Sequence, residues 1–147
     1  MSTDSDDANV DGTEDGIVAP EDVESQVFDW GVLKWLCTPE VTGAENLSAG
    51  VVRLEPGKGH DLHEHPDSEE ILYVVSGTGE QTIAGDTAEI GPGEAVYIPA
   101  GVEHGTINTG WNTLELLAVY TPPGPEDVLG DLPECTIVPA GEIPTRE

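Results

Sequence analysis

Basic residues are scarce in this chain of 147 residues. Four lysines and arginines stand against 30 aspartates and glutamates, so the formal net charge at pH 7 is −26 with neutral histidines. Nucleic acids and anionic lipid surfaces are bound through Lys and Arg, which displace counterions and meet negative headgroups. The composition therefore predicts a protein with neither nucleic-acid nor membrane partners.

Long apolar runs and cysteine pairs are also missing. The apolar runs reach about five residues, as in 71–75 and 116–120, whereas a membrane helix needs about 18. The N-terminus is acidic where a secretory signal would be basic and then apolar. Cys37 and Cys135 lack the close spacing of a metal-binding pair. We expect a cytoplasmic protein with two free thiols.

Acidic residues are abundant along the whole chain. Residues 1–24 hold nine of the 30 acids and no base, which leaves 21 acids and four bases, or −17, on residues 25–147. Such a charge strains the compact state by self-repulsion, and molar salt screens it because the Debye length falls to about 3 Å. We hypothesise that the protein works in the cytoplasm of an extreme halophile.

The regular spacing of turn-forming residues along the chain predicts one all-β domain. Residues 1–24, rich in Asp, Glu, Ser and Thr, are expected to form an acidic disordered extension of a domain spanning 25–147. From residue 28 on, short runs rich in Val, Ile and Leu are broken by Gly, Pro, Asn or Asp. The expected strands are 31–36, 48–54, 60–65, 70–75, 79–84, 87–90, 95–98, 102–108 and 113–120. Residues 126–147 are expected to be a peripheral tail with a short strand near 136–138.

All four histidines lie in or beside two glycine-rich segments. In an extended strand His63 and His65 point to the same face. Glu70 opens the next expected strand, and His104 follows a Pro-x-Gly turn. Taken alone, the His-x-His pair could be a surface pair. Three imidazoles and a carboxylate are, however, suitable ligands for one divalent transition metal ion: Fe, Mn, Ni, Cu or Zn.

The spacing around these side chains forms two motifs. The first contains Gly57, five residues, His63-Glu64-His65, four residues, Glu70, six residues and Gly77. The second contains Gly93, five residues, Pro99-Ala100-Gly101, two residues, His104, three residues and Asn108. They resemble the two conserved motifs of the cupin superfamily, G(X)5HXH(X)3-4E(X)6G and G(X)5PXG(X)2H(X)3N. Every fixed position is filled, and 15 residues separate the motifs, as in small single-domain cupins.

The resemblance implies a type-2 cupin, whose fold is a double-stranded β-helix or jelly-roll barrel. It also implies the metal ligands that project into that barrel: His63, His65, Glu70 and His104. The motif allows three or four residues before its glutamate, so Glu69 competes with Glu70, and the six-residue count to Gly77 selects Glu70. The motif glycines, Pro99 and Asn108 are interpreted as turn and strand-end geometry.

One histidine, His60, has no place in the motif. It is either a polar residue of the turn before the expected strand or a group that contacts a ligand or the substrate at the mouth of the barrel. The sequence leaves both alternatives open.

A barrel of this kind serves many functions, so the fold does not fix the activity. A complete ligand set favours a mononuclear metalloenzyme acting on a small oxygen-bearing substrate, with an oxygenase-like oxidoreductase such as a dioxygenase first and an isomerase or lyase next. Glu70 is the predicted catalytic residue, which would shuttle a proton. The alternative is a non-catalytic, metal-containing ligand-binding or sensor module. The resemblance also implies a homodimer.

Overall fold

The computed structural model describes residues 16–144. Ten strands and three short helical turns follow one another along this part of the chain. They are η1 (Pro20–Asp22), β1 (Ser25–Phe28), β2 (Gly31–Cys37), α2 (Pro39–Thr42), β3 (Ser48–Leu54), β4 (Glu69–Ser76), β5 (Gly79–Ile83), β6 (Asp86–Ile90), β7 (Ala95–Ile98), β8 (His104–Asn108), β9 (Leu114–Thr121), α3 (Pro125–Gly130) and β10 (Thr136–Val138).

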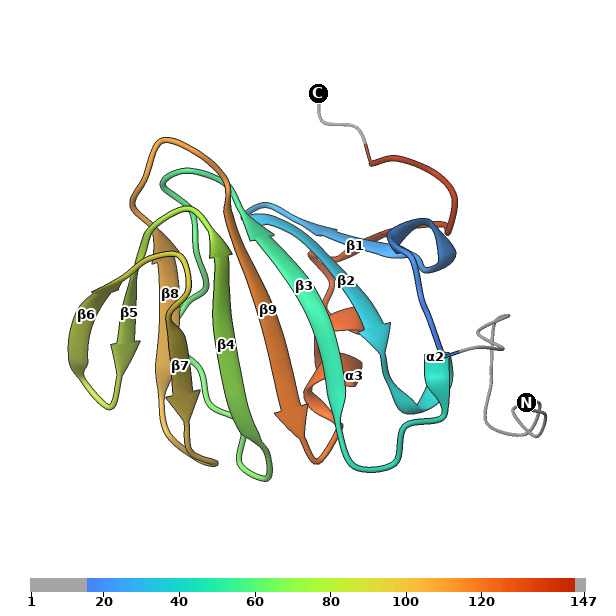
Figure 1. The fold of residues 1–147 in the computed structure, drawn as a ribbon, viewed down its shortest axis with the longest axis horizontal. Coiled ribbons are helices and arrows are strands. Elements are labelled where there is room, and N and C mark those ends of the chain that lie inside the picture. Colours follow the sequence, from blue (N-terminus) through green and yellow to red (C-terminus); the bar gives the residue numbers. More distant parts are fainter. Residues whose placement is uncertain (1–15, 145–147) are drawn as a thin grey trace.

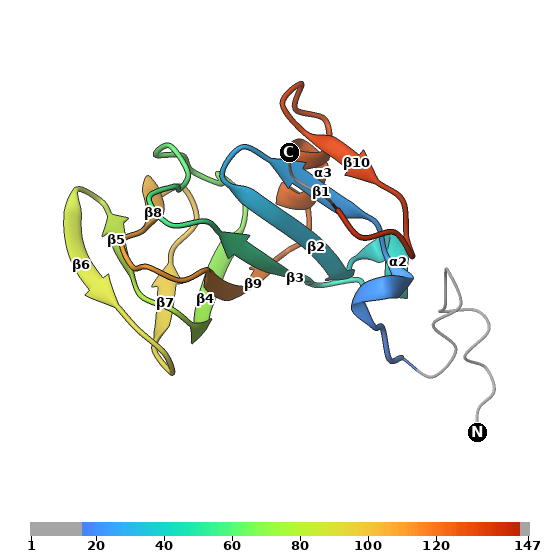
Figure 2. The same ribbon diagram turned by 90° about the horizontal axis from the view of Figure 1, so that it is seen from above.

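The strands form two antiparallel sheets. The larger has the order β10-β1-β2-β3-β9-β4-β7, and the smaller has the order β6-β5-β8. Figure 1 shows β2, β3, β9 and β4 side by side, with β5, β6 and β8 at one end of the molecule. Figure 2 shows β1, β10 and α3 together at the other end. The all-β, double-stranded β-helix architecture expected from the sequence is confirmed.

The core lies on the inner face of the large sheet. In β3, β4 and β9 every second side chain is buried, which is the two-residue period of a strand with one covered face. Val52 lies opposite Leu116, and Leu72 lies opposite Ala118. Ile90 of β6 joins the same core. Burial of these alternating apolar side chains fixes the register, because a slip by one residue would turn each of them to solvent.

The expected strands agree with the structure except at 60–65. That segment makes isolated bridges to β8 instead of a regular strand, at Gly59–Ile107 and His63–His104. The first expected strand, 31–36, is preceded by β1, which the sequence reading did not identify. The short strand near 136–138 is present as β10, where it pairs with β1.

Both ends of the described chain are more closely packed than the sequence suggests. Residues 1–15 of the expected extension lie outside the described residues. Val23, inside the expected extension, is buried, and the Lys34 ammonium donates hydrogen bonds to the carbonyls of Pro20 and Val23. Cys37 and Cys135 are both free. Within residues 16–144, no helix has the length and apolarity needed to span a membrane.

Candidate metal centre

An irregular segment, residues 57–65, brings two of the histidines against β8. The His60 amide donates to the Thr106 carbonyl, and His63 and His104 exchange both of their backbone hydrogen bonds, at 2.9 and 2.8 Å. Gly59 pairs with Ile107 and His63 pairs with His104, so the segment advances four residues while β8 advances three. The segment therefore holds one surplus residue. This bulge is the physical reason that 60–65 is not a regular strand.

The bulge changes which side chains face inward. Pairing with the buried Thr106 directs His60 toward the interior, and pairing with the buried His104 does the same for His63. An odd separation of three residues would place them on opposite faces of a regular strand. Gly59 is required beside them because a Cβ atom there would lie 2.2 Å from the Thr106 carbonyl oxygen.

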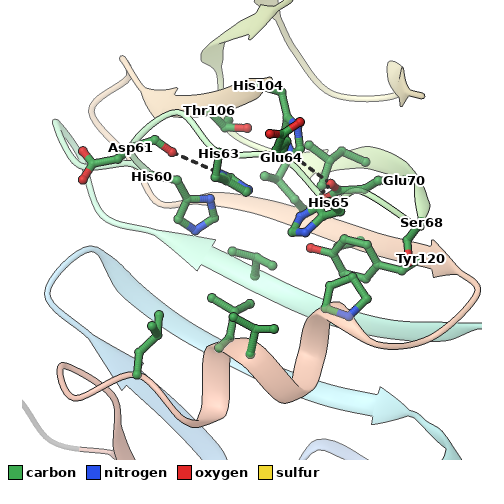
Figure 3. Close-up of a pocket in the computed structure, with 18 of the residues that line it drawn as sticks. His60, Asp61, His63, Glu64, His65, Ser68, Glu70, His104, Thr106 and Tyr120 are labelled. Carbon is green, nitrogen blue, oxygen red and sulfur yellow. Dashed lines mark hydrogen bonds and ion pairs between the residues drawn. The ribbon is translucent and has the colours of Figure 1, made fainter. Parts of the chain in front are cut away.

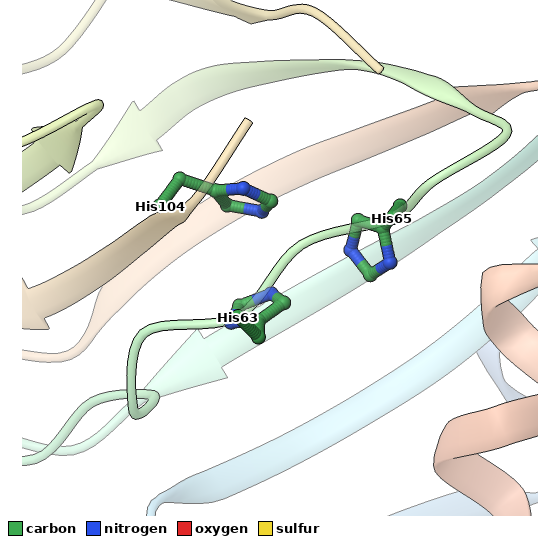
Figure 4. A group of neighbouring side chains, drawn as sticks. All are labelled: His63, His65 and His104. Carbon is green, nitrogen blue, oxygen red and sulfur yellow. The ribbon is translucent and has the colours of Figure 1, made fainter. Parts of the chain in front are cut away.

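Three imidazoles converge at this point. His63 and His65 come from the irregular segment and His104 opens β8, as Figure 4 shows. One ring nitrogen from each lies within 4.8 Å of the other two. Such a cluster could hold a single metal ion. The fold therefore brings together the three histidines predicted from the motif.

Two of these rings are oriented by backbone carbonyls. His63 Nδ1 lies 2.8 Å from the Asp61 oxygen, and His104 Nδ1 lies 2.9 Å from the Val102 oxygen. Because a carbonyl can only accept, each Nδ1 carries the proton as the donor. Each Nε2 then keeps a lone pair for a metal ion, which is the usual way in which a ligating histidine is held.

The carboxylate of Glu70 completes the group (Figure 3). Glu70 is the second residue of β4 and is buried. Its Oε1 atom lies 3.0 Å from His104 Nε2 and 3.6 Å from His65 Nε2. Glu69 points to the opposite face, where it is exposed and accepts a hydrogen bond from the Tyr97 hydroxyl. The geometry therefore brings Glu70, and not Glu69, to the histidines.

Unpartnered buried atoms concentrate at this site. Among the described residues, five buried side-chain polar atoms lack a hydrogen-bond partner, and four of them belong to residues that line one cavity. Those four are His60 Nε2, His65 Nε2, Glu70 Oε1 and His104 Nε2, of which the last two lie 3.0 Å apart and pair with each other when His104 is protonated. A buried polar atom without a partner costs about 1–3 kcal/mol. A cation bound by His65, Glu70 and His104 would satisfy three of them, so these residues fit a metal ion.

Burial and mutual repulsion keep several of the imidazoles neutral. Desolvation, with repulsion from the other histidines, lowers the pKa of His60 to about 3. Desolvation, partly offset by Glu70, lowers the pKa of His65 to about 4. Desolvation also lowers the pKa of His63. For His104, burial acts in the same direction, but Glu70 and the Val102 carbonyl outweigh it and raise the pKa.

Tyr120 was not among the site residues predicted from the sequence. Its ring packs edge-on against His65 at a centroid distance of 5.1 Å, and its position on β9 is directly opposite Glu70. Burial, together with the charge of the nearby Glu70 carboxylate, raises the pKa of Tyr120 well above 10. Tyr120 therefore keeps its proton beside the carboxylate. The sequence did contain a signal for its inward position: Tyr120 continues the two-residue alternation of Leu116 and Ala118 on the same strand.

Residues 126–134, the start of the stretch 126–147 predicted to be a peripheral tail, are part of the site wall. They continue α3 and the turn beyond it. Val128, Leu129 and Leu132 line the cavity that contains the histidines and supply part of its apolar lining. The sequence did not indicate this because the helix is too short for a helical pattern, and its apolar side chains contact a site distant in sequence.

The motif residues expected to shape turns do so. Gly57, Gly77, Gly93 and Gly101 have φ values between 77° and 89°, which glycine adopts without strain. The Asn108 side chain is buried and donates to the carbonyls of Leu54 and Asn112. These residues support the barrel, and the Gly101 amide also donates to the His65 carbonyl at 2.9 Å, which anchors the segment that carries two of the histidines.

Comparisons with known proteins agree with this geometry. Residues 50–120 match the Cupin domain family. Polyketide synthase CurC from Streptomyces cyaneus is 30% identical over 78% of this chain and 74% of its own. Protein SchB from Streptomyces halstedii is 33% identical over 78% and 83%. The solved structure of Bacillus subtilis oxalate decarboxylase, described for its Mn(II) centres, has a TM-score of 0.65 and 26% identity over 71% of this chain and 28% of its own.

Proposed function

Because this chain belongs to the cupin family, we propose that it is a mononuclear metalloenzyme acting on a small oxygen-bearing organic substrate. In this proposal His63, His65, Glu70 and His104 bind one divalent transition metal ion. The observation that carries it is the convergence of buried atoms without partners, His65 Nε2, Glu70 Oε1 and His104 Nε2, beside the oriented ring of His63. The metal would supply Lewis-acid chemistry toward a substrate oxygen, and a redox-active ion would add electron transfer.

The protein's own side chains contribute orientation and proton handling. The backbone carbonyls of Asp61 and Val102 hold two imidazoles in the tautomer that leaves Nε2 free. The Glu70 carboxylate is the proposed catalytic base, which accepts a proton from a substrate hydroxyl. Tyr120, opposite Glu70 on β9, stays protonated beside that carboxylate because burial raises its pKa. The reaction proposed first is oxygenase-like oxidation, with isomerase or lyase chemistry as the alternative.

The test begins with metal content. The protein is purified in high salt without chelator, because its charge of −26 needs screening, and bound metals are measured by elemental analysis. We expect near one metal ion per chain. The double variant His63→Ala/His104→Ala should lose it, while the matched variant Glu103→Gln, an exposed neighbour of His104, should retain it. Full metal content in the double variant would overturn the ligand set.

Activity is then followed with the metal-loaded protein. The names of its relatives include a polyketide synthase and an oxalate decarboxylase, so the substrate panel contains acetylacetone, catechol and oxalate. Oxygen uptake would support the oxygenase-like reaction, whereas substrate loss without oxygen uptake would support the isomerase or lyase. Tight binding of a panel compound without any turnover would contradict the enzyme proposal and support the sensor module.

A further inference from the structure

The cavity beside the histidines is larger than a two-carbon acid requires. Its volume is about 790 Å³, which lies in the range of pockets that enclose ring-containing ligands. The histidine triad, defined as His63, His65 and His104, and the Glu70 carboxylate lie together in one region of the cavity, as Figure 3 shows. The rest of the lining includes the apolar side chains of Phe28, Trp30, Pro123, Val128, Leu129 and Leu132.

The charges of the cavity argue against an anionic substrate. Within residues 16–144, the charged residues that line it are all acidic: Asp29, Asp61, Glu64, Asp67, Glu70 and Glu134. None of the three described basic side chains lines the cavity. Lys34 binds carbonyls near β1 and Arg53 pairs with Glu115 at 3.3 Å, while Lys58 lies at the edge of the cavity, where it pairs with the lining residue Asp29 at 2.9 Å. Away from the metal ion, a dicarboxylate would therefore meet acidic side chains and no lysine or arginine among the described lining residues.

His60 supplies a polar group at a second point. Its ring stands edge-on to Trp30, at a centroid distance of 4.3 Å, and lies 5.6 Å from that of His63. It lines the cavity but is outside the three-histidine cluster. Its Nε2 atom is buried without a partner, and a metal ion in the cluster does not account for that atom. A neutral imidazole offers one donor and one acceptor.

We infer that the substrate is an uncharged, ring-containing compound with phenolic or enolic oxygens at the triad and a further hydroxyl or carbonyl that hydrogen-bonds to His60. His60 is then a specificity-determining residue, and the apolar wall of α3 covers the body of the ring system. This inference rests on the proposed function, because it requires a metal ion bound to the triad at that part of the cavity.

Binding to the Co(II)-loaded protein tests the inference without turnover. The probes are oxalate, 2,3-dihydroxynaphthalene and its 6-hydroxy derivative, titrated by calorimetry and by the visible spectrum of the cobalt. We expect both naphthols to bind at least about tenfold more tightly than oxalate. The third hydroxyl should add a further factor of about ten, the value of one good hydrogen bond. His60→Phe should abolish that factor, His60→Gln should restore part of it, and Glu69→Gln should leave it unchanged.

The outcomes separate the two proposals. A protein that binds no Co(II) would overturn the proposed function. A protein that binds Co(II) at the triad but prefers oxalate, or binds neither naphthol, would overturn the substrate class alone. If the third hydroxyl adds nothing in the wild type, or still adds a factor of ten in a folded His60→Phe protein, the role of His60 is wrong. Circular dichroism of both His60 variants checks that the comparison concerns folded protein.

Discussion

The two ends of the barrel interior are built from the same strands but hold different chemistry. At one end, the inward positions of β3, β4 and β9 are Leu54, Val74 and Leu114, all with 0% exposure. At the other end of the same strands they are Ser48, Glu70 and Tyr120. The two-residue period decides which side chains enter the barrel, and the position along the strand decides whether those side chains are apolar or polar. The apolar end is a rigid base on which the polar end can be held in place.

The largest expected effect falls on the apolar end. Leu114→Ala should lower the free energy of unfolding by about 3 kcal/mol, because it leaves a cavity where the chain cannot collapse. Urea denaturation of the metal-free protein measures the loss. Leu117→Ala, on the half-buried outer face of the same strand, should cost less. Metal content should stay the same in both variants, and a metal-free but folded Leu114→Ala protein would contradict the separation of the two ends.

The next effect falls on the polar end. Residues that merely support a metal ligand typically cost about 10- to 100-fold in metal affinity when they are replaced. Glu70→Gln replaces a proposed ligand and should weaken metal binding by more than this range. Glu69→Gln, one residue away and facing outward, should change the affinity by less than about twofold. Competition with a metal-binding dye measures both values. Equal losses in the two variants would show that position within the strand does not select the ligand.

The smallest effect is a pH dependence that the polar end alone should cause. In the metal-free protein, His60 and His65, with pKa values of about 3 and about 4, stay neutral in the folded state but take up protons on unfolding below about 6.5. The unfolded state thus binds more protons, so the free energy of unfolding falls as the pH is lowered from 6.5 to 5. For each of these two histidines the slope approaches about 1.4 kcal/mol per pH unit as the unfolded imidazole becomes fully protonated. His104, whose pKa is raised, acts in the opposite direction near pH 6.5, where its folded state binds more protons than its unfolded state, and this contribution fades at lower pH.

The variant His60→Phe isolates this effect. It should remove one histidine's share of the slope in urea denaturation series at pH 6.5, 6 and 5, while Leu114→Ala should shift the whole series without changing its slope. An unchanged slope in His60→Phe would mean that the imidazole is not held neutral in the folded protein.

The sequence was sufficient for the parts of the molecule that depend on local periods and fixed spacing. The strands from Ser48 to Leu54 and from Ala95 to Ile98 have the bounds that alternation and turn residues predict. The spacing of the two motifs selected Glu70 over Glu69 and identified three histidines that the fold brings together. Each of these inferences needs only which residues alternate and how far apart they are.

The remainder depends on contacts between distant segments. Tyr120 reaches the site because β9 pairs with β4 in a register that sets it opposite Glu70. The apolar wall of α3 depends on where the chain turns after β9. The inward direction of His60 depends on the extra residue in its pairing with β8. No single segment encodes these contacts, so inspection of each segment alone could not predict them.

The surplus residue between Gly59 and His63 also bears on which histidines share the inward face. His60 and His63 are three residues apart, an odd separation, and they face one side because the bulge interrupts the alternation. Removing Asp61 or Leu62 would make the pairing with β8 regular and shorten this separation to two residues, so both rings would still face inward. The fixed count of five residues after Gly57 in the first motif includes this bulge. Relatives with one residue fewer at this point can therefore keep the same inward pair, and they should be compared by their pairing with β8 as well as by residue count.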